Sequence, residues 1–506
     1  MAQSEFPHHA DVVVAGGGPA GATIARLLAE FGFGVVLVEK RQFPRHQIGE
    51  SLTPHILPLL DFLGIRRQVE AAGFLRMVGH TVCWGSAQPR TSYYSSDRTR
   101  HGFQAWRADF DNLLLAHARN AGVQTIEGLP VDSVTVESGT RVTVSTRQGK
   151  ISSTFFIDAS GHAGILARQN LRQRDDTYRT LALTGYWRNA TGPAGDDFTN
   201  TLLETYPGGL VWSVPLHNGL RNVTLLIDWH EGSRIRRTGL TNFYLSELQQ
   251  AVYVSEFLTP AQLSHPPQVF DATWYTASAF AGEQFLLVGD AGLFIDPLSS
   301  EGVHKAMSSA ITGAIVVNTI LKRPTMRPHA LQFYSDTQQL TYDTYYQQSA
   351  QYYREERRWQ EQPFWQKRSS RKVQSPESDV QSPKSKVQSP RFKVQGLSQP
   401  NTRKVLALRI APGITTEPRP VIEGPFVELR EVVVAPRYPR GVRILHEVHL
   451  PQLLATVSQH SAVASILESY LATPEGNRCP PESVRQVLAR LYHEGILVSI
   501  DATETR

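Results

Sequence analysis

The sequence predicts an α/β fold in which a Rossmann-like domain is interrupted by an inserted antiparallel-sheet domain. A short apolar strand, a glycine-rich turn and a helix follow one another between residues 11 and 31. From residue 178 to 277 the pattern changes to apolar–polar alternation, which is typical of antiparallel strands with one buried face. A buried strand returns at 285–291 and a helix follows it, so we expect the first domain to be discontinuous.

The N-terminal strand leads into three glycines, Gly16, Gly18 and Gly21, with the spacing G-x-G-x-x-G. In such a turn the first glycine forms the bend, the second lets a pyrophosphate approach and the third allows close helix–strand packing. A second strand ends at Glu39, 23 residues after Gly16, where a carboxylate would bind ribose hydroxyls. Lys40 follows as a further candidate. The ordered series of strand, glycines, helix, strand and acid predicts a dinucleotide site rather than an ordinary glycine-rich turn.

The pattern divides the chain into five segments. We predict a dinucleotide-binding domain at 1–175 and 278–330, a sheet domain at 176–277, a long helix at 331–369, a disordered repeat at 370–400 and a C-terminal module at 401–506. The repeat has a Val-Gln-Ser-Pro core and a period of seven. Its prolines exclude a coiled coil, and its sparse apolar content cannot form a core.

The C-terminal module is predicted to contain two helices, at 450–472 and 481–495, followed by a strand at 496–500. This order resembles a small winged helix. A helical cap that closes over the sheet domain is an equally good interpretation of the same pattern.

The composition favours a globular enzyme in a reducing cytoplasm. The 506 residues include two cysteines, Cys83 and Cys479, too few for a disulfide framework or a thiolate metal site, so we expect no metal. The net charge is +5, but residues 351–404 hold thirteen Lys or Arg against five Asp or Glu. The basicity therefore belongs to one segment, and we expect no nucleic-acid partner. No apolar run is long enough to span a membrane, and the N-terminus lacks a signal-peptide core, so we expect no membrane partner.

Several motifs occur in a fixed order along residues 11–359. They are the glycine turn with Glu39, Ile48-Gly-Glu-Ser51, Arg107 ahead of Phe110-Asp111, Asp158-Ala-Ser-Gly161 and Val288-Gly-Asp-Ala-Gly-Leu-Phe-Ile-Asp-Pro297. As a set they resemble the flavin-dependent halogenases of the tryptophan halogenase type and related single-component flavin monooxygenases.

This resemblance implies FAD as the cofactor. It places Asp290 on the ribityl chain and the helix that begins at Gly302 beneath the isoalloxazine. It also implies that Ser51, Arg107 and Pro297 bind flavin. An aspartate can accept ribityl hydroxyls, and a helix N-terminus can stabilise negative charge on reduced flavin.

Three residues depart from the halogenase pattern. Met77 stands where the resemblance implies a lysine that passes hypohalous acid to the substrate, and a thioether cannot do this. Leu210 replaces the first tryptophan of a Trp-x-Trp-x-Ile-Pro motif. Glu301 lies where relatives carry Ser or Thr near a halide, and a carboxylate there repels an anion unless its side chain turns away. The departures affect halogen chemistry and leave flavin binding intact.

The sequence therefore predicts an FAD-dependent monooxygenase on a halogenase-like scaffold. It would hydroxylate an electron-rich, aromatic substrate through a flavin C4a-hydroperoxide, with O₂ as co-substrate and Glu301 as candidate general base. One alternative is a halogenase with a non-standard active site. Another is a flavoprotein that modifies a peptide- or protein-borne residue docked by the C-terminal module.

Only one dinucleotide fingerprint is present, so reduced flavin must come from NAD(P)H that binds transiently or from a separate flavin reductase. The expected substrate is a small molecule, free or bound to a carrier or peptide.

Overall fold

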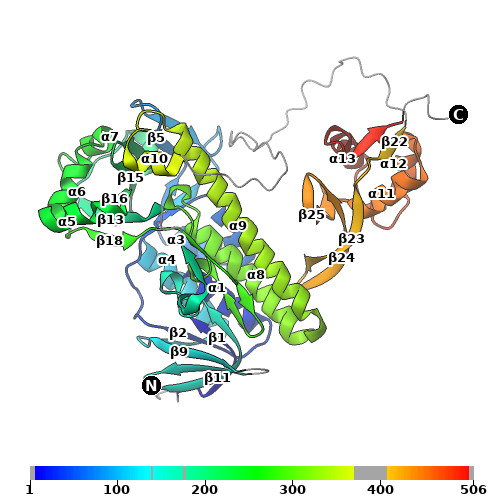
Figure 1. The fold of residues 1–506 in the computed structure, drawn as a ribbon, viewed down its shortest axis with the longest axis horizontal. Helices are drawn as coiled ribbons and strands as arrows, with labels where there is room; N and C mark the ends of the chain where they lie inside the picture. Colours follow the sequence, from blue (N-terminus) through cyan, green and yellow to red (C-terminus); the bar gives the residue numbers. More distant parts are fainter. Residues whose placement is uncertain (1–5, 138–140, 175–177, 370–406, 501–506) are drawn as a thin grey trace. The chain divides into compact units, whose positions relative to one another are not determined.

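The computed structural model describes residues 6–137, 141–174, 178–369 and 407–500 (Figure 1). The chain divides into two compact units, Met1–Val373 and Gln374–Arg506. The predicted repeat at 370–400 lies outside the described residues. Within the described part of the chain, no helix combines the length and the apolar content needed to cross a membrane.

A largely parallel sheet forms the base of the first unit. β1 (His9–Ala15) pairs in parallel with β2 (Val35–Glu39) and with β11 (Gly149–Asp158). β21 (Phe285–Leu287) pairs in parallel with β11, so the chain returns to this sheet after a long excursion, as predicted. The sheet is completed by β8 (Gln124–Glu127), β9 (Val131–Glu137), β10 (Arg141–Thr146) and β20 (Ala281–Gly282).

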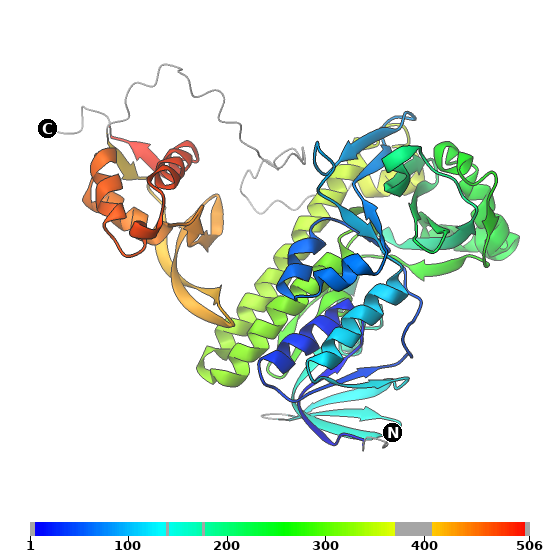
Figure 2. The same cartoon turned by 180° about the vertical axis from the view of Figure 1, so that it is seen from behind.

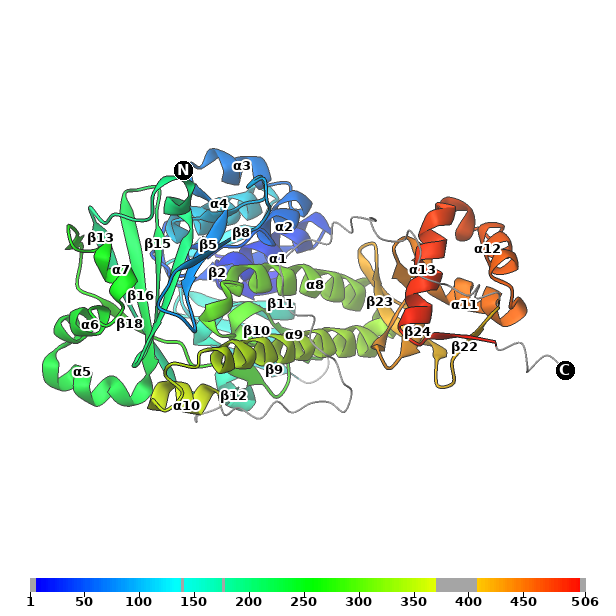
Figure 3. The ribbon, with the colours of Figure 1, turned by 90° about the horizontal axis from the view of Figure 1, so that it is seen from above.

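Helices cover this sheet. α1 (Pro19–Glu30) packs against α4 (Arg107–Asn120) and α8 (Gly302–Lys322). α8 and α9 (Arg327–Glu355) run side by side, as Figures 2 and 3 show. The central strands β1 and β2 carry uninterrupted apolar runs, at 12–15 and 35–38, because both of their faces are covered. Shorter helices of the first unit are α2 (Ile56–Phe62), α3 (Arg66–Ala71) and α10 (Pro363–Ser369).

A second, mostly antiparallel sheet is inserted between β11 and β21. Its strands are β13 (Thr180–Arg188), β14 (Thr201–Tyr206), β15 (Gly209–Pro215), β16 (Leu220–Asp228), β17 (Gln262–Leu263) and β18 (Gln268–Asp271). Two earlier strands, β5 (Gly79–Cys83) and β6 (Arg90–Tyr93), extend it, with β5 parallel to β14. The sheet thus includes residues from outside the predicted range 176–277, and the predicted domain limits stay a prediction.

Successive side chains in the strands of the second sheet point to opposite faces, and both faces are buried. One face carries Leu183, Val223 and Leu225 and packs against α5 (Gly232–Thr238), α6 (Leu240–Leu248) and α7 (Val252–Glu256). The other carries Ala182 and Leu226 and faces the first domain. Two small sheets lie between the large ones: β3 (Ser51–Leu52), β7 (Gly102–Gln104) and β4 (Leu75–Met77) form one, and β12 (Arg172–Arg174) and β19 (Tyr275–Ala277) the other.

The second unit has a core of its own, built from three helices and short strands. These are α11 (Leu450–Gln459), α12 (Val463–Leu471), α13 (Pro481–His493), β22 (Leu408–Ile410), β23 (Thr415–Glu423), β24 (Phe426–Ala435), β25 (Tyr438–Val442), β26 (Ile444–Leu445), β27 (Val448–His449) and β28 (Leu497–Ser499).

The predicted single helix at 450–472 is wrong, because α11 and α12 are separate helices. His460 and Ala462 are extended, and the Ser461 carbonyl accepts the backbone N–H of Leu408 instead of a helical donor. A winged helix in this unit stays a prediction.

Candidate active site

The glycine turn joins β1 to α1 in the conformation that its spacing predicts. Gly16 has a φ of +105°, and a Cβ there would overlap the carbonyl oxygen of Ala159. A Cβ at Gly21 would overlap the Gly16 carbonyl oxygen, so only glycine lets the helix pack this closely. At Gly18 an added Cβ would lie 3.1 Å from Arg45 Nη2 and otherwise meet open space. The second glycine and the first turn of α1 therefore face a free volume.

Glu39 supports this turn from the end of β2. Its Oε2 accepts the backbone N–H of Gly17 at 2.7 Å, and its Oε1 accepts the N–H of Arg41 at 2.9 Å. The residue is 5% exposed and lines the same cavity as Lys40. A carboxylate in this position, beside the glycine turn, is the one expected to meet a ribose.

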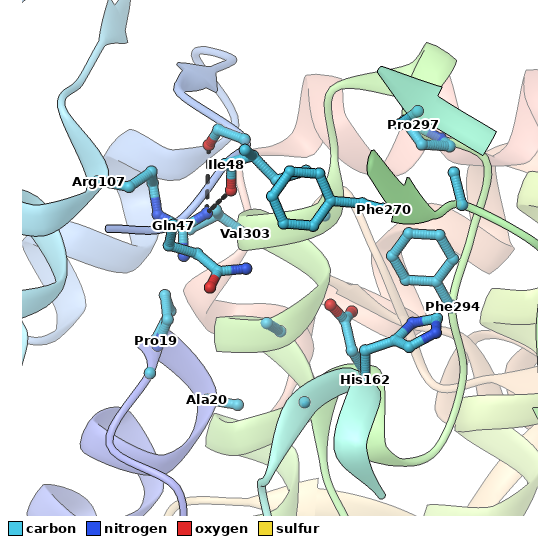
Figure 4. A pocket seen from close by; sticks show the side chains of 18 of the residues that line it. Pro19, Ala20, Gln47, Ile48, Arg107, His162, Phe270, Phe294, Pro297 and Val303 are labelled. Atoms are coloured by element: carbon cyan, nitrogen blue, oxygen red, sulfur yellow. Dashed lines mark hydrogen bonds between the residues drawn. The ribbon is translucent and has the colours of Figure 1, made fainter. Parts of the chain in front are cut away.

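A cavity of about 390 Å³ extends from the glycine turn to the second sheet. Figure 4 shows Pro19 and Ala20 at one end and Phe270, Phe294 and Pro297 at the other. Nine of the ten predicted cofactor residues line it: Gly16, Gly18, Glu39, Lys40, Ser51, Arg107, Asp290, Pro297 and Gly302. Gly21 is the exception because it packs against the turn.

Arg107 opens α4 and is buried. Its Nε and Nη2 donate to Asp111 at 2.9 and 3.1 Å, and its Nη1 donates to the carbonyls of Ile48 and Gly49 at 2.8 and 3.3 Å (Figure 4). The guanidinium thus fixes the segment that brings Ser51 to the cavity.

Asp290 lies in a short turn after β21. Its Oδ1 accepts Lys305 Nζ at 2.7 Å, and its backbone carbonyl accepts the Tyr275 hydroxyl at 2.6 Å. The Lys305 side chain is 1% exposed, whereas that of Asp290 is 33% exposed. A paired but accessible carboxylate can accept hydroxyl groups such as those of a ribityl chain.

The cavity continues over the inner face of the second sheet. The side chains there come from five strands: Ala182, Thr201, Trp212, Thr224 and Phe270. The small residues leave room, while Trp212, Phe270 and Phe294 provide flat apolar walls suited to an aromatic ligand. Among the described residues that line the cavity, Lys40 is the one lysine, and it lies at the glycine-turn end.

Met77 ends β4 with its side chain buried. Its Sδ accepts hydrogen bonds from Ser51 Oγ at 3.3 Å, Thr201 Oγ1 at 3.1 Å and the Tyr94 hydroxyl at 3.8 Å. Ser51 and Thr201 line the cavity, so hydroxyl groups face it at this point.

Leu210 lies on the same face of β15 as Trp212, two residues away. It is fully buried in a cluster with Trp84 and Trp365 and does not line the cavity, whereas Trp212 does. The first position of the Trp-x-Trp motif therefore serves packing in this chain.

Glu301 precedes α8 but does not line the cavity, although both of its sequence neighbours do. Its Oε1 accepts Thr53 Oγ1 at 2.8 Å and lies 2.9 Å from His55 Nδ1, and its Oε2 lies 3.1 Å from His304 Nδ1. Burial alone would raise the pKa of Glu301, but hydrogen bonding to His304, His55 and Thr53 outweighs it and lowers the pKa to about 2. Such a weak proton acceptor, held away from the cavity, does not favour the predicted general-base role.

Glu50 is a cavity residue that sequence reasoning missed. Its side chain is buried, its Oε1 accepts the Tyr186 hydroxyl from β13, and its Oε2 accepts the Gly49 N–H at 2.9 Å. Burial raises the pKa of Glu50. Its place beside Ser51 in a flavin motif was the available signal, but Tyr186 is 136 residues away in sequence.

The residues at the glycine-turn end fit FAD. The open position at Gly18 and the N-terminus of α1 admit a pyrophosphate, and Lys40, Arg41 and Arg45 line the cavity beside them with positive charge. Within the described residues, no group of three or more His, Cys, Asp or Glu is arranged to hold a metal ion.

The sequence model of the tryptophan halogenase family matches residues 11–91 and 85–395. The chain belongs to the tryptophan halogenase family. It is 35% identical over 340 residues to a tryptophan 2-halogenase of Chondromyces crocatus. The aligned region covers 65% of this chain and 65% of that protein, so the chain spans a little under two thirds of the length of this relative. It is 32% identical over 377 residues to the flavin-dependent halogenase armH4 of Armillaria mellea, covering 67% of this chain and 70% of that one.

Solved structures of the family share the fold. The flavin-dependent halogenase CmlS matches with a TM-score of 0.78 and 25% identity over 98% of this chain and 96% of its own. The peptidyl tryptophan dihydroxylase QhpG matches with a TM-score of 0.68 and 23% identity over 96% of this chain and 99% of its own, a likeness of fold alone. The predicted fold class, family and flavin-dependent oxidoreductase type are confirmed.

Proposed function

We propose that this chain is an FAD-dependent monooxygenase that hydroxylates an electron-rich aromatic carbon. The observation that carries the proposal is the sheet end of the cavity. There, the hydroxyls of Ser51 and Thr201 donate to the sulfur of Met77. Among the described lining residues the one lysine, Lys40, lies at the opposite, glycine-turn end. An amine that could accept an oxidised halogen is missing from the place where the family resemblance expects one.

The chain's own residues bind, orient and shield. FAD, once reduced, supplies the electrons that activate O₂. The glycine turn and Glu39 bind the dinucleotide, while Trp212, Phe270 and Phe294 orient a flat substrate and exclude water. Glu50 presents a carboxyl group to the cavity, so it is better placed than Glu301 to hold or move a proton. Reduced flavin comes from NAD(P)H or from a separate reductase.

Halogenation is the second candidate, and one observation favours it. The Glu301 carboxylate is turned into a cluster with Thr53, His55 and His304, so it does not oppose an anion inside the cavity. The named relatives are halogenases. Of the three residues that depart from the halogenase pattern, Met77 is then the one that contacts cavity-lining hydroxyls, those of Ser51 and Thr201.

The substrate is a small molecule or a residue carried by a peptide. The C-terminal unit has its own core around Leu453, Ile466 and Leu488, which supports a separate docking role. Product formation from a free indole by the full chain and by residues 1–400 would test that role, because a docking unit is dispensable for a free substrate.

The decisive experiment separates oxygenation from halogenation. The enzyme-bound flavin is reduced anaerobically, oxygen is admitted with and without bromide, and products from a panel of phenols and indoles are identified by mass spectrometry. We expect hydroxylated product, or peroxide alone, at a rate that bromide does not change. Brominated product from the wild type would establish the halogenase instead.

A further inference from the structure

Glu50, Tyr186 and His46 form a connected chain of polar groups that leads away from the cavity. Glu50 lines the cavity and is 2% exposed. The Tyr186 hydroxyl donates to Glu50 Oε1 and lies 3.0 Å from Nε2 of His46. The Tyr186 side chain is 9% exposed, whereas His46 is partly exposed. The three groups thus join the interior of the cavity to the protein surface.

The ring of Tyr186 is held in place by aromatic neighbours. It lies edge-on to the rings of His46 and Trp106, at centroid separations of 5.3 and 5.5 Å. Tyr186 belongs to β13, which pairs with β16 on one side and with β17 and β18 on the other, so its hydroxyl cannot move far from Glu50. A fixed hydroxyl that contacts an acid on one side and an imidazole on the other is a proton-transfer bridge.

Burial moves the pKa values of Glu50 and His46, the two end groups, in opposite directions and towards each other. Burial raises the pKa of Glu50, against hydrogen bonds from Tyr186 and Gly49 and the charge of Arg107. Arg107 makes its bidentate pair with Asp111 and leaves Glu50 without a salt bridge. Burial lowers the pKa of His46, and Arg41 and His265 lower it further, so its imidazole is neutral and can accept a proton.

We propose that Glu50, Tyr186 and His46 form a proton relay that carries a proton from the cavity to solvent. Hydroxylation of an aromatic carbon by O₂, with reduced FAD as the electron source, replaces C–H by C–OH, and the second oxygen atom leaves as water. The ring carbon releases one proton when aromaticity is restored, and the departing oxygen takes up a proton from solvent, so the overall reaction is neutral in protons. The Glu50 carboxylate takes the proton that the ring carbon releases. The proton then moves from Glu50 to the Tyr186 oxygen as the Tyr186 hydroxyl proton passes to Nε2 of His46. The O–H bonds of Glu50 and Tyr186 break, new O–H and N–H bonds form on Tyr186 and His46, and the imidazolium releases its proton to water.

In this relay Glu50 touches the reacting proton, whereas Tyr186 and His46 act through it as positioning residues. The inference rests on the proposed function for the source of the proton. The hydrogen-bonded connection itself is independent of that function, because the three side chains would exchange protons with solvent in any reaction at this cavity.

The connection between Glu50 and Tyr186 is tested by infrared titration of the FAD-bound enzyme. The C=O stretch of protonated Glu50 is identified as the band that Glu50→Gln removes, and its midpoint is followed against pH. Tyr186→Phe removes a donor that stabilises the carboxylate, so we expect the midpoint to rise by about one to two pH units. Tyr93→Phe removes a partly buried hydroxyl that donates to Asp197 and should leave the midpoint unchanged. An unchanged midpoint in Tyr186→Phe would overturn the relay.

The surface end is tested by chemical rescue. His46→Ala should lower turnover about tenfold or more and shift its pH profile, because proton transfer by a positioned group contributes at least this much. Added imidazole should restore most of the loss in His46→Ala but not in Tyr186→Phe. Flavin content and thermal midpoint identify any variant that fails to fold. The relay would be refuted if imidazole failed to rescue His46→Ala while the Glu50 band titrated as in the wild type. Brominated product together with successful rescue would refute only the proposed function.

Discussion

The two ends of the cavity differ in where their contacts come from. At the glycine-turn end, Gly21 packs against Gly16 and Glu39 accepts the N–H of Gly17, all within a single strand–helix–strand unit. At the sheet end, the side chains around Met77 come from three separate segments of the chain, at Ser51, Tyr94 and Thr201. Cofactor binding is therefore encoded by short-range spacing. The reaction depends on a few long-range contacts, which can change while the cofactor site persists.

The largest expected effect is loss of the cofactor. Gly18→Leu should abolish stoichiometric FAD, because the Cβ fits but the rest of the side chain fills the volume that admits the pyrophosphate. The measurement is flavin absorbance per chain after desalting. Gly232→Ala is the matched control, since a Cβ there meets no heavy atom closer than 3.8 Å. Retained FAD in Gly18→Leu would break the assignment of this end of the cavity.

A smaller effect is expected at Arg107, which serves both ends. Arg107→Gln leaves the fully buried Asp111 with only Arg45, at 3.3 Å, as a counter-charge. We expect unfolding to become easier by about 3 kcal/mol, measured by urea denaturation. Arg66→Gln removes two surface ion pairs, with Asp61 and Glu70, and should cost less than about 1 kcal/mol. Equal effects of the two substitutions would contradict a structural role for the buried pair.

Met77→Lys sharpens the distinction between the ends. The new ammonium would meet the hydroxyls of Ser51, Thr201 and Tyr94, none of which is hydrogen-bonded to a carboxylate in the described structure, so we expect a loss of stability of about 2 kcal/mol. FAD content should be unchanged. Mass spectrometry with bromide should show no brominated product, because the side chain at this position lies behind the hydroxyls of Ser51 and Thr201 and does not itself line the cavity. Met77→Leu controls for loss of the sulfur, and bromination by Met77→Lys would show that one residue separates the two activities.

The smallest effect is the pH dependence of the Glu301 cluster. The pKa of Glu301 falls from 4.5 to about 2, so its contribution is present above pH 4.5 and is lost as the pH falls towards 2. Hydrogen bonding to Glu301 raises the pKa of His55 from 6.5, so that contribution is present below pH 6.5 and is lost as the pH rises through the folded value. The stability difference between wild type and Glu301→Gln should therefore peak between about pH 4.5 and 6.5, at roughly 1–2 kcal/mol after allowance for the exposed His55. A difference independent of pH would show that the cluster does not hold its charges.

Sequence patterns predict the parts of this molecule that local spacing determines. The glycine turn, the return of β21 to the first sheet and the alternating second sheet follow from residues close in sequence. The orientation of Glu301 does not, because His55 is 246 residues away, nor does the link from Glu50 to Tyr186. The break between α11 and α12 was also missed, since both helices are apolar and the interruption depends on a hydrogen bond from Leu408. Such contacts become visible only when the fold brings distant segments together.

The path of the chain between the two large sheets has a consequence for how ligands enter. The chain crosses into or out of the second sheet after β4, β6, β12 and β18. Four covalent connections at different points restrain the two sheets, because a rotation that one connection allows is opposed by the other three. We therefore expect the cavity of about 390 Å³ to keep its outline when a ligand binds, so that the space left beside the cofactor limits the size of the molecule that it accepts.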